Sequence, residues 1–124
     1  METVSEQKTD ERRQFRRTSL SEPVRFEFND PRHFGGSLSG DISVGGIRLR
    51  VSDFVPIGTE LTLQVQLSPS RTVSCQGRVM WVEKIPFGDD YRIGLKFVDN
   101  QSLGQAQELI QDFVEFNRLQ NLKS

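Results

Sequence analysis

Apolar and polar residues alternate along most of the middle of the chain, which is the pattern of half-buried β-strands. In residues 24–28 (VRFEF), Val24, Phe26 and Phe28 fall on one face and the charged residues fall on the other. The same period of two recurs in residues 47–51 (IRLRV), 61–67 (LTLQVQL), 73–81 (VSCQGRVMW) and 91–97 (YRIGLKF). The side chains predicted to share the inward faces of these segments are Ile47, Leu49, Val51, Leu61, Leu63, Val65, Leu67, Val73, Cys75, Val79, Trp81, Tyr91, Ile93, Leu95 and Phe97.

A sixth, weaker strand is predicted at residues 37–42 (SLSGDI), where Leu38 and Ile42 are in phase. Turn-forming residues separate the strands, at Asn29-Asp30-Pro31, Gly35-Gly36, Pro56-Ile57-Gly58, Ser68-Pro69-Ser70 and Pro86-Phe87-Gly88-Asp89. No helical pattern lies between the strands, so neighbouring strands are expected to be antiparallel. Roughly six strands with short connections predict a closed or nearly closed barrel, because closure removes exposed sheet edges.

After Val98 the period of the apolar residues changes to that of a helix. Ser102 followed by Gln105 fits a capping box, so the helix is expected to start there. We expect this helix to pack over the open end of the barrel, although a partner or dimer surface is the alternative. Its apolar stripe consists of Leu103, Ala106, Leu109, Ile110, Phe113, Val114, Phe116 and Leu119.

Composition and charge limit the possible functions of this 124-residue chain. The net charge is −1, which argues against a surface that seeks nucleic acid or anionic lipid as a whole. The apolar runs are too short for a membrane span, and the N-terminus lacks the apolar stretch of a secretory signal, so a cytoplasmic location is expected. The patterns divide the chain into a disordered lead-in (residues 1–11), a barrel with a preceding arginine segment (12–100) and an amphipathic helix (101–124).

Candidate catalytic residues are poorly supported. His33, the one histidine, lies in a predicted loop with nothing to place a nucleophile or carboxylate beside it. Cys75 lies on an inward strand face and is interpreted as core. Asp89 and Asp90 are interpreted as a solvated turn, and no group has metal-ligand spacing. The sequence therefore predicts a binding protein without catalytic residues, metal or cofactor.

Two polar segments carry the candidate binding chemistry. In ERRQFRRTSL (residues 11–20), Arg12, Arg13, Arg16 and Arg17 are close together, and a guanidinium can pair with a phosphate or a guanine edge and stack on a purine. In DISVGG (residues 41–46), an aspartate can accept from a guanine N–H, a serine can reach a phosphate, and two glycines permit unusual backbone angles and close approach. Taken singly, the arginine segment also fits a solvated basic linker, and the second segment also fits a turn that requires glycine.

In combination, Arg13-x-x-x-Arg17 followed by Asp41-x-Ser43-x-x-Gly46 at a strand junction resembles the PilZ domain family. Residues 77–82 (GRVMWV) and 91–99 (YRIGLKFVD) are similar to the later strands of that family, and a helix follows where members often carry one. The resemblance covers about residues 11 to 120. It implies a six-stranded antiparallel PilZ-type β-barrel with a C-terminal α-helix, in agreement with the all-β fold with a terminal helix that the alternation predicts. It also implies binding of the bacterial second messenger cyclic di-GMP.

The resemblance assigns roles to individual residues. Arg13 and Arg17 would hold the guanines and phosphates, while Asp41, Ser43 and Gly46 would form the floor of the site. Arg12 would stack on a second ligand molecule if cyclic di-GMP binds as an intercalated pair, and Arg16 would face solvent. Gly45, Arg48 and Trp81 are secondary ligand-binding candidates, but the alternation phase of Trp81 favours the core.

The resemblance also implies a receptor or adaptor that acts on an unidentified protein partner. Ligand binding would order the arginine segment against the barrel and so change the surface that the partner meets. Motility, pili, exopolysaccharide synthesis and virulence are the processes that the family regulates. Two alternatives stay open: a PilZ-like protein–protein adaptor that binds no nucleotide, and a single-stranded nucleic-acid binder, which is disfavoured because the strand aromatics fall mostly in the inward phase.

Overall fold

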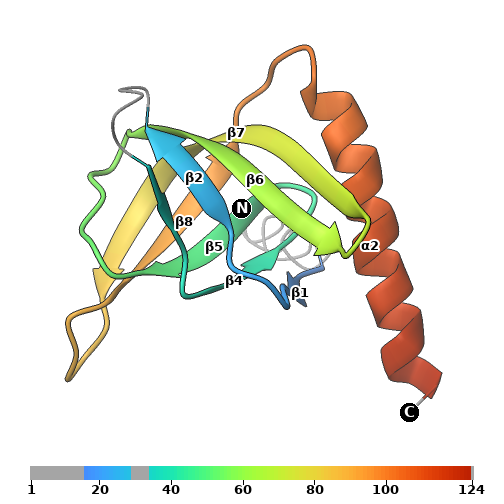
Figure 1. Ribbon diagram of the computed structural model, residues 1–124, viewed down its shortest axis with the longest axis horizontal. Helices are drawn as coiled ribbons and strands as arrows, with labels where there is room; N and C mark the ends of the chain where they lie inside the picture. The colour runs from blue at the N-terminus through green and yellow to red at the C-terminus, as the bar shows by residue number, and fades with distance from the viewer. Residues whose placement is uncertain (1–15, 29–33, 124) are drawn as a thin grey trace, which may run out of the picture.

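The computed structural model of this chain describes residues 16–28 and 34–123. The predicted lead-in, together with Arg12, Arg13 and His33, lies outside the described residues. A helix follows a series of strands (Figure 1), as the alternation and the later change of period predict. The elements are β1 (Thr18–Ser19), β2 (Arg25–Phe28), β3 (Phe34–Gly36), β4 (Ser39–Ile42), β5 (Gly46–Val51), β6 (Glu60–Ser68), β7 (Arg71–Lys84), β8 (Tyr91–Phe97) and α2 (Leu103–Lys123).

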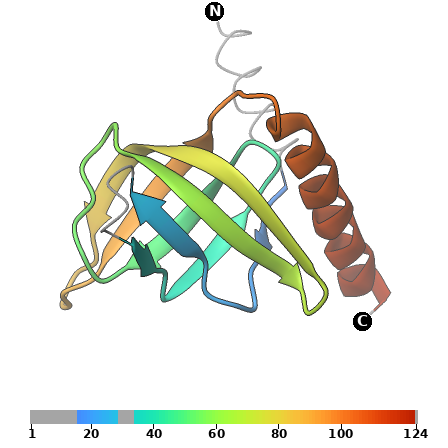
Figure 2. The same ribbon diagram turned by 45° about the horizontal axis from the view of Figure 1, so that its top comes forward.

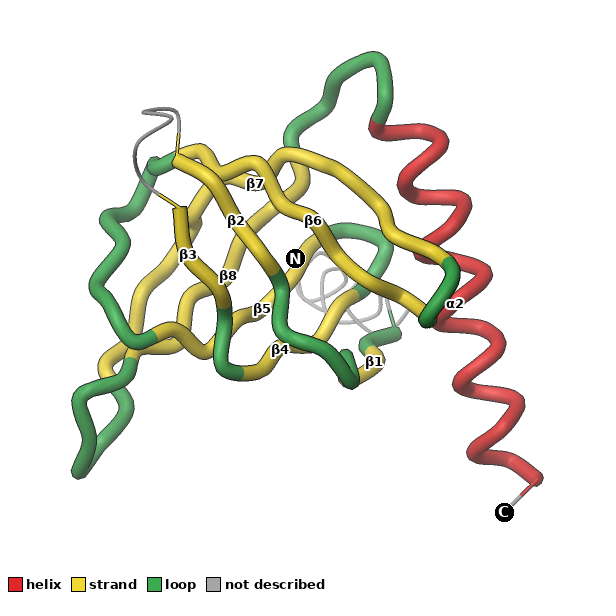
Figure 3. Tube along the Cα trace, in the orientation of Figure 1, coloured by secondary structure: helices red, strands yellow, loops and turns green. Residues whose placement is uncertain are grey.

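The strands form one antiparallel sheet whose two ends meet. The order in the sheet is β1-β4-β5-β8-β7-β6-β2-β3, and the chain joins its ends twice, from β1 to β2 and from β3 to β4. These two connections are hydrogen-bonded to each other, because Ser37 N–H donates to Val24 O (2.9 Å) and Val24 N–H donates to the Ser37 hydroxyl (2.8 Å). The sheet therefore curls into a barrel (Figure 3).

The predicted fold class is confirmed, and the number of strands differs for a local reason. The sheet has eight strands. The six predicted segments correspond to β2, β4, β5, β6, β7 and β8. The additional strands, β1 and β3, are short, and each continues across a bend into a predicted strand. Leu38 marks one bend: it is 54% exposed, contrary to its predicted inward phase, because Ser37 instead turns inward to bond with Val24.

The inward faces of the long strands meet in a single apolar core. Most of the side chains predicted to face inward are buried, among them Val24, Ile47, Leu63, Val79 and Ile93. Their burial confirms the alternation, and it stabilises the barrel because apolar surface leaves water. The core also contains residues of α2, so the barrel and the helix share it.

The prediction that Trp81 belongs to the core is wrong. The register between β7 and β8 shifts at this point: Val79 pairs with Leu95, but Trp81 pairs with Gly94. Such a β-bulge inserts an extra residue and moves the following side chain to the opposite face. Trp81 is consequently on the outer face and 37% exposed, while Val82 packs against the core.

Helix α2 lies beside the barrel (Figure 2) and packs against β7 and β1, so the predicted packing of the helix on the barrel is confirmed. Ala106, Ile110 and Val114 are buried in the shared core, so the first half of the apolar stripe has a structural role. Phe116 and Leu119 do not belong to this contact, because they are 60% and 46% exposed. Within the described residues, no helix combines the length and apolarity that a membrane crossing requires.

Burial of Cys75 leads to a testable prediction about its thiol. The side chain lies in the core, as predicted, and burial raises its pKa from 9.0 to about 12 because a thiolate is poorly solvated there. We expect the native protein to resist alkylation by iodoacetamide at pH 8. We also expect the free energy of unfolding to fall as the pH rises from about 9 towards 12, since the unfolded thiol ionises first.

A Cys75→Ala variant is the control for the second expectation. If wild type and this variant lose stability equally between pH 9 and 11 in chemical denaturation, the buried thiol is not responsible. Rapid alkylation of the native wild type would contradict the first expectation.

Candidate functional site

The turn between β4 and β5 is held by several hydrogen bonds. The last pair of the two strands is Ile42 opposite Ile47. Beyond it, the Ser43 N–H donates to Gly46 O at 2.9 Å, and the Ser43 hydroxyl donates to the same oxygen at 3.3 Å. The Phe97 N–H donates to Gly45 O at 3.3 Å, which ties the turn to the end of β8. Ser43 is buried, its hydroxyl helps to close the turn, and the residue lines the site described below.

Gly46 is required by the close approach of a neighbouring strand. A Cβ atom at this position would lie 2.3 Å from the carbonyl oxygen of Leu95 on β8, far inside van der Waals contact. Gly45 differs, because a Cβ atom there would meet nothing within 4 Å. Neither glycine has a positive φ. The unusual backbone angles that these glycines would permit are therefore not used at the turn, and the close approach observed at Gly46 is that of β8.

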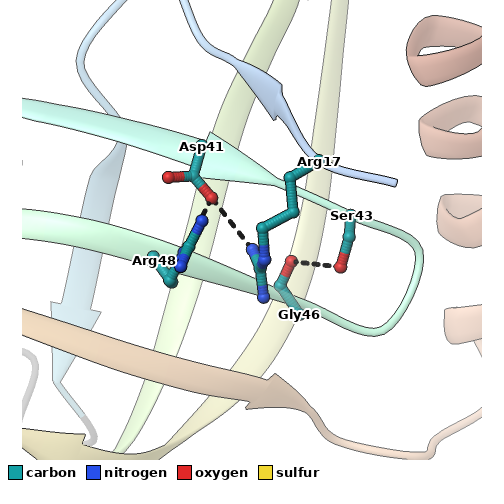
Figure 4. Close-up of polar contacts among 5 residues, drawn as sticks. All are labelled: Arg17, Asp41, Ser43, Gly46 and Arg48. Carbon is teal, nitrogen blue, oxygen red and sulfur yellow. Dashed lines mark hydrogen bonds and ion pairs between the residues drawn. The ribbon is translucent and has the colours of Figure 1, made fainter. Parts of the chain in front are cut away.

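Three charged side chains form a cluster beside this turn (Figure 4). Arg17 Nη1 and Arg48 Nε each lie 3.0 Å from Asp41 Oδ1. Strand pairing causes this arrangement, since Asp41 lies opposite Arg48 on β5 and opposite Ser19 on β1, two residues after Arg17. The side chains are 33%, 30% and 43% exposed for Arg17, Asp41 and Arg48. One carboxylate between two guanidinium groups leaves the cluster net positive.

A cleft of about 540 Å³ lies over the turn and this cluster. Its lining includes the cations Arg17, Arg48 and Lys96, and no carboxylate among the described residues. Trp81 forms part of the wall and packs over Gly94, where a Cβ atom would lie 2.2 Å from the indole. The full lining is Arg17, Ser43, Gly45, Gly46, Ile47, Arg48, Met80, Trp81, Gly94, Leu95 and Lys96. The cleft thus combines positive charge with an aromatic surface, which suits an anion that carries a flat ring.

The described candidate residues lie together. Of the residues predicted from the sequence, Arg17, Ser43, Gly45, Gly46, Arg48 and Trp81 line the cleft, and Asp41 contacts two of them. Arg12 and Arg13 lie outside the described residues. Arg16 is exposed and does not line the cleft, in agreement with the expectation that it faces solvent.

Sequence reasoning missed Lys96, Met80 and Gly94. Alternation places Lys96 and Gly94 on the outer face of their strand, but it does not identify the neighbouring strands. The sheet supplies that information: Lys96 pairs with Gly46 on one side and with Arg78 on the other. Met80 reaches the cleft at the β-bulge that also moves Trp81 outward.

Comparison with known families gives one match over most of the chain. The model of the PilZ domain matches residues 11–116. No curated protein matches the sequence significantly.

Solved structures with a similar fold include PilZ domains. The Bacillus subtilis inhibitor of motility MotI/DgrA superposes with a TM-score of 0.68 at 22% identity, covering 88% of this chain and 52% of that one. YcgR from Escherichia coli in complex with c-di-GMP gives 0.65 at 15% identity, covering 90% and 50%. A tetrameric PilZ domain protein from Xanthomonas campestris gives 0.64 at 14% identity, covering 87% and 89%. The chain thus spans about half the length of the first two, and at these identities the likeness concerns the fold.

Proposed function

Because the chain belongs to the PilZ domain family, we propose that it is a receptor for cyclic di-GMP that passes the signal to a protein partner. The observation that supports this most strongly is that Arg17 and the turn that follows Asp41, which are distant in sequence, meet at one cationic cleft. A dianionic dinucleotide supplies the two features that this cleft complements, phosphates and flat purines. The YcgR structure with bound c-di-GMP is consistent with this ligand class.

Each polar group has a specific role in the proposed complex. Arg17 and Lys96 bind phosphate oxygens, and Arg48 stacks on or pairs with a guanine. Both described ion pairs of Asp41 end on Oδ1, so Oδ2 accepts from a guanine N–H. Ser43 contributes its hydroxyl, Gly45 leaves room for the ligand at the turn, and Gly46 lines the cleft while it allows the close approach of β8.

The N-terminal arginines complete the proposed site. Arg13 joins Arg17 in holding the ligand, and Arg12 stacks on a second molecule if cyclic di-GMP binds as an intercalated pair. Closure of this segment over the ligand changes the surface next to β1, and that surface is the one read by the partner. The partner belongs to a motility, pilus, exopolysaccharide or virulence system, and the motility inhibitor MotI has a similar fold.

Fluorescence of the single tryptophan tests this function. Trp81 lines the cleft, and it is the only tryptophan in the chain. We expect its emission to fall on titration with cyclic di-GMP, because a guanine placed against the indole quenches it. Cyclic di-AMP at the same concentration is the control and is expected to leave the emission unchanged. An unchanged emission in the presence of calorimetrically detected binding would place the ligand elsewhere.

A further inference from the structure

Helix α2 is hydrogen-bonded to the turn at the centre of the proposed ligand site. The Gln107 side chain donates from Nε2 to the carbonyl oxygen of Val44, at 3.0 Å. Val44 lies between Ser43 and Gly45, both of which line the cleft. The bond joins residues 63 positions apart and is partly buried, so water competes with it less than at an exposed site.

Gln107 is held on a rigid support. Its neighbours on the inward side of α2, Ala106 and Ile110, are 4% and 0% exposed and belong to the shared core. The position of the amide is therefore determined by the docking of the helix on the barrel. Any rotation or sliding of α2 on the barrel breaks or strains the bond to Val44.

The same helix also faces the arginine-containing half of the site. Helix α2 packs against β1, which directly follows Arg16 and Arg17 (Figure 2). On the helix, Arg118 Nε donates to Glu115 Oε1 at 3.0 Å. This bond lowers the pKa of Glu115, and the positive charge of Arg16 lowers it further. The positive charge of the arginine segment is thus felt by Glu115, an acidic residue of α2.

We propose that Gln107 is a positioning residue that couples docking of α2 to the shape of the ligand turn, so that α2 is the element through which ligand occupancy is transmitted. The proposal rests on the proposed function, because it assigns the regulation of the same cleft. Coupling of this kind is reciprocal: if a docked helix favours the ligand-binding turn, the bound ligand favours the docked helix by the same factor.

A Gln107→Met variant tests the coupling, because it keeps the length and neutrality of the side chain and removes the donor. The matched control is Gln105→Met, on the exposed side of the same helix. We expect Gln107→Met to bind cyclic di-GMP about three- to tenfold more weakly than wild type, as for loss of one neutral hydrogen bond, and Gln105→Met to bind within twofold. Calorimetry on the full chain measures both affinities.

Hydrogen exchange gives the readout that a merely structural role would not change. In wild type, cyclic di-GMP is expected to slow amide exchange in residues 103–114 of α2. In Gln107→Met, the ligand is expected to give no such protection. The thermal midpoint of Gln107→Met without ligand is expected to stay close to that of wild type. Equal affinity of wild type and Gln107→Met, or unchanged exchange in α2 on binding, would overturn the coupling.

Failure of the proposed function is distinguishable from failure of this proposal. If wild type does not bind cyclic di-GMP, the receptor function is wrong. The effect of Gln107 on the turn is then tested by hydrogen exchange without ligand. In that case, exchange of the amides in residues 43–46 is expected to be faster in Gln107→Met than in Gln105→Met. Equal exchange in the two variants would show that Gln107 does not brace the turn.

Discussion

Replacing Arg17 with alanine is expected to weaken cyclic di-GMP binding by roughly 30- to 150-fold, equivalent to about 2–3 kcal/mol for a lost charge-assisted contact. Arg17 lines the cleft and is held 3.0 Å from Asp41, so its guanidinium is already oriented without ligand. Little conformational freedom is then lost on binding, which makes its contact with a phosphate more favourable. Asp41 retains its ion pair with Arg48 in the variant, so the barrel is expected to stay folded.

Arg25→Ala is the matched control for this prediction. Arg25 is an exposed residue of β2 that does not line the cleft, and its loss changes the net charge by the same amount. Calorimetric titration is expected to give an affinity within twofold of wild type. An equal loss of affinity in Arg17→Ala and Arg25→Ala would mean that binding depends on overall charge, as in non-specific binding of a polyanion.

Replacing Gly46 with alanine is expected to lower the free energy of unfolding by about 1–3 kcal/mol, the usual cost of adding a methyl group where there is no space. The new Cβ would lie 2.3 Å from Leu95 O, so β5 and β8 must separate at the point where they form the floor of the cleft. Backbone atoms cannot rotate away as a flexible side chain can. Cyclic di-GMP affinity is expected to fall with stability, because the same shift displaces Ser43.

Gly45→Ala separates the effect of crowding from that of backbone freedom. A methyl group at this position meets nothing within 4 Å, and its φ is not positive, so the free energy of unfolding is expected to change by less than about 0.5 kcal/mol. Urea denaturation of both variants makes the comparison. If Gly46→Ala is as stable as Gly45→Ala, the contact with Leu95 does not determine the choice of glycine at position 46.

The long strands were predictable from the sequence because alternation is a local signal. The outward position of Trp81 was not, since the β-bulge after Val79 changes the phase within a segment that still alternates in sequence. The short strands β1 and β3 were also not predictable, because two or three residues cannot establish a period.

The candidate site was predictable to a different degree at each residue. The spacing of Arg17, Asp41 and Gly46 resembles a known pair of motifs, so these positions were identified without coordinates. Lys96 carries no such signal: it reaches the cleft because β8 lies between β5 and β7, and this order depends on contacts between distant segments. Long-range pairing of this kind is not contained in local patterns.

The central claim is that the chain binds cyclic di-GMP in the cleft between the two motif segments, and isothermal titration calorimetry of the intact chain with cyclic di-GMP tests it most directly. We expect saturable binding with a Kd in the micromolar range or tighter, with one ligand per chain or two if it binds as an intercalated pair. The receptor function would be contradicted if the chain did not bind cyclic di-GMP at micromolar concentrations. This holds whether the chain binds arbitrary single-stranded oligonucleotides in a salt-dependent way or binds no nucleotide at all.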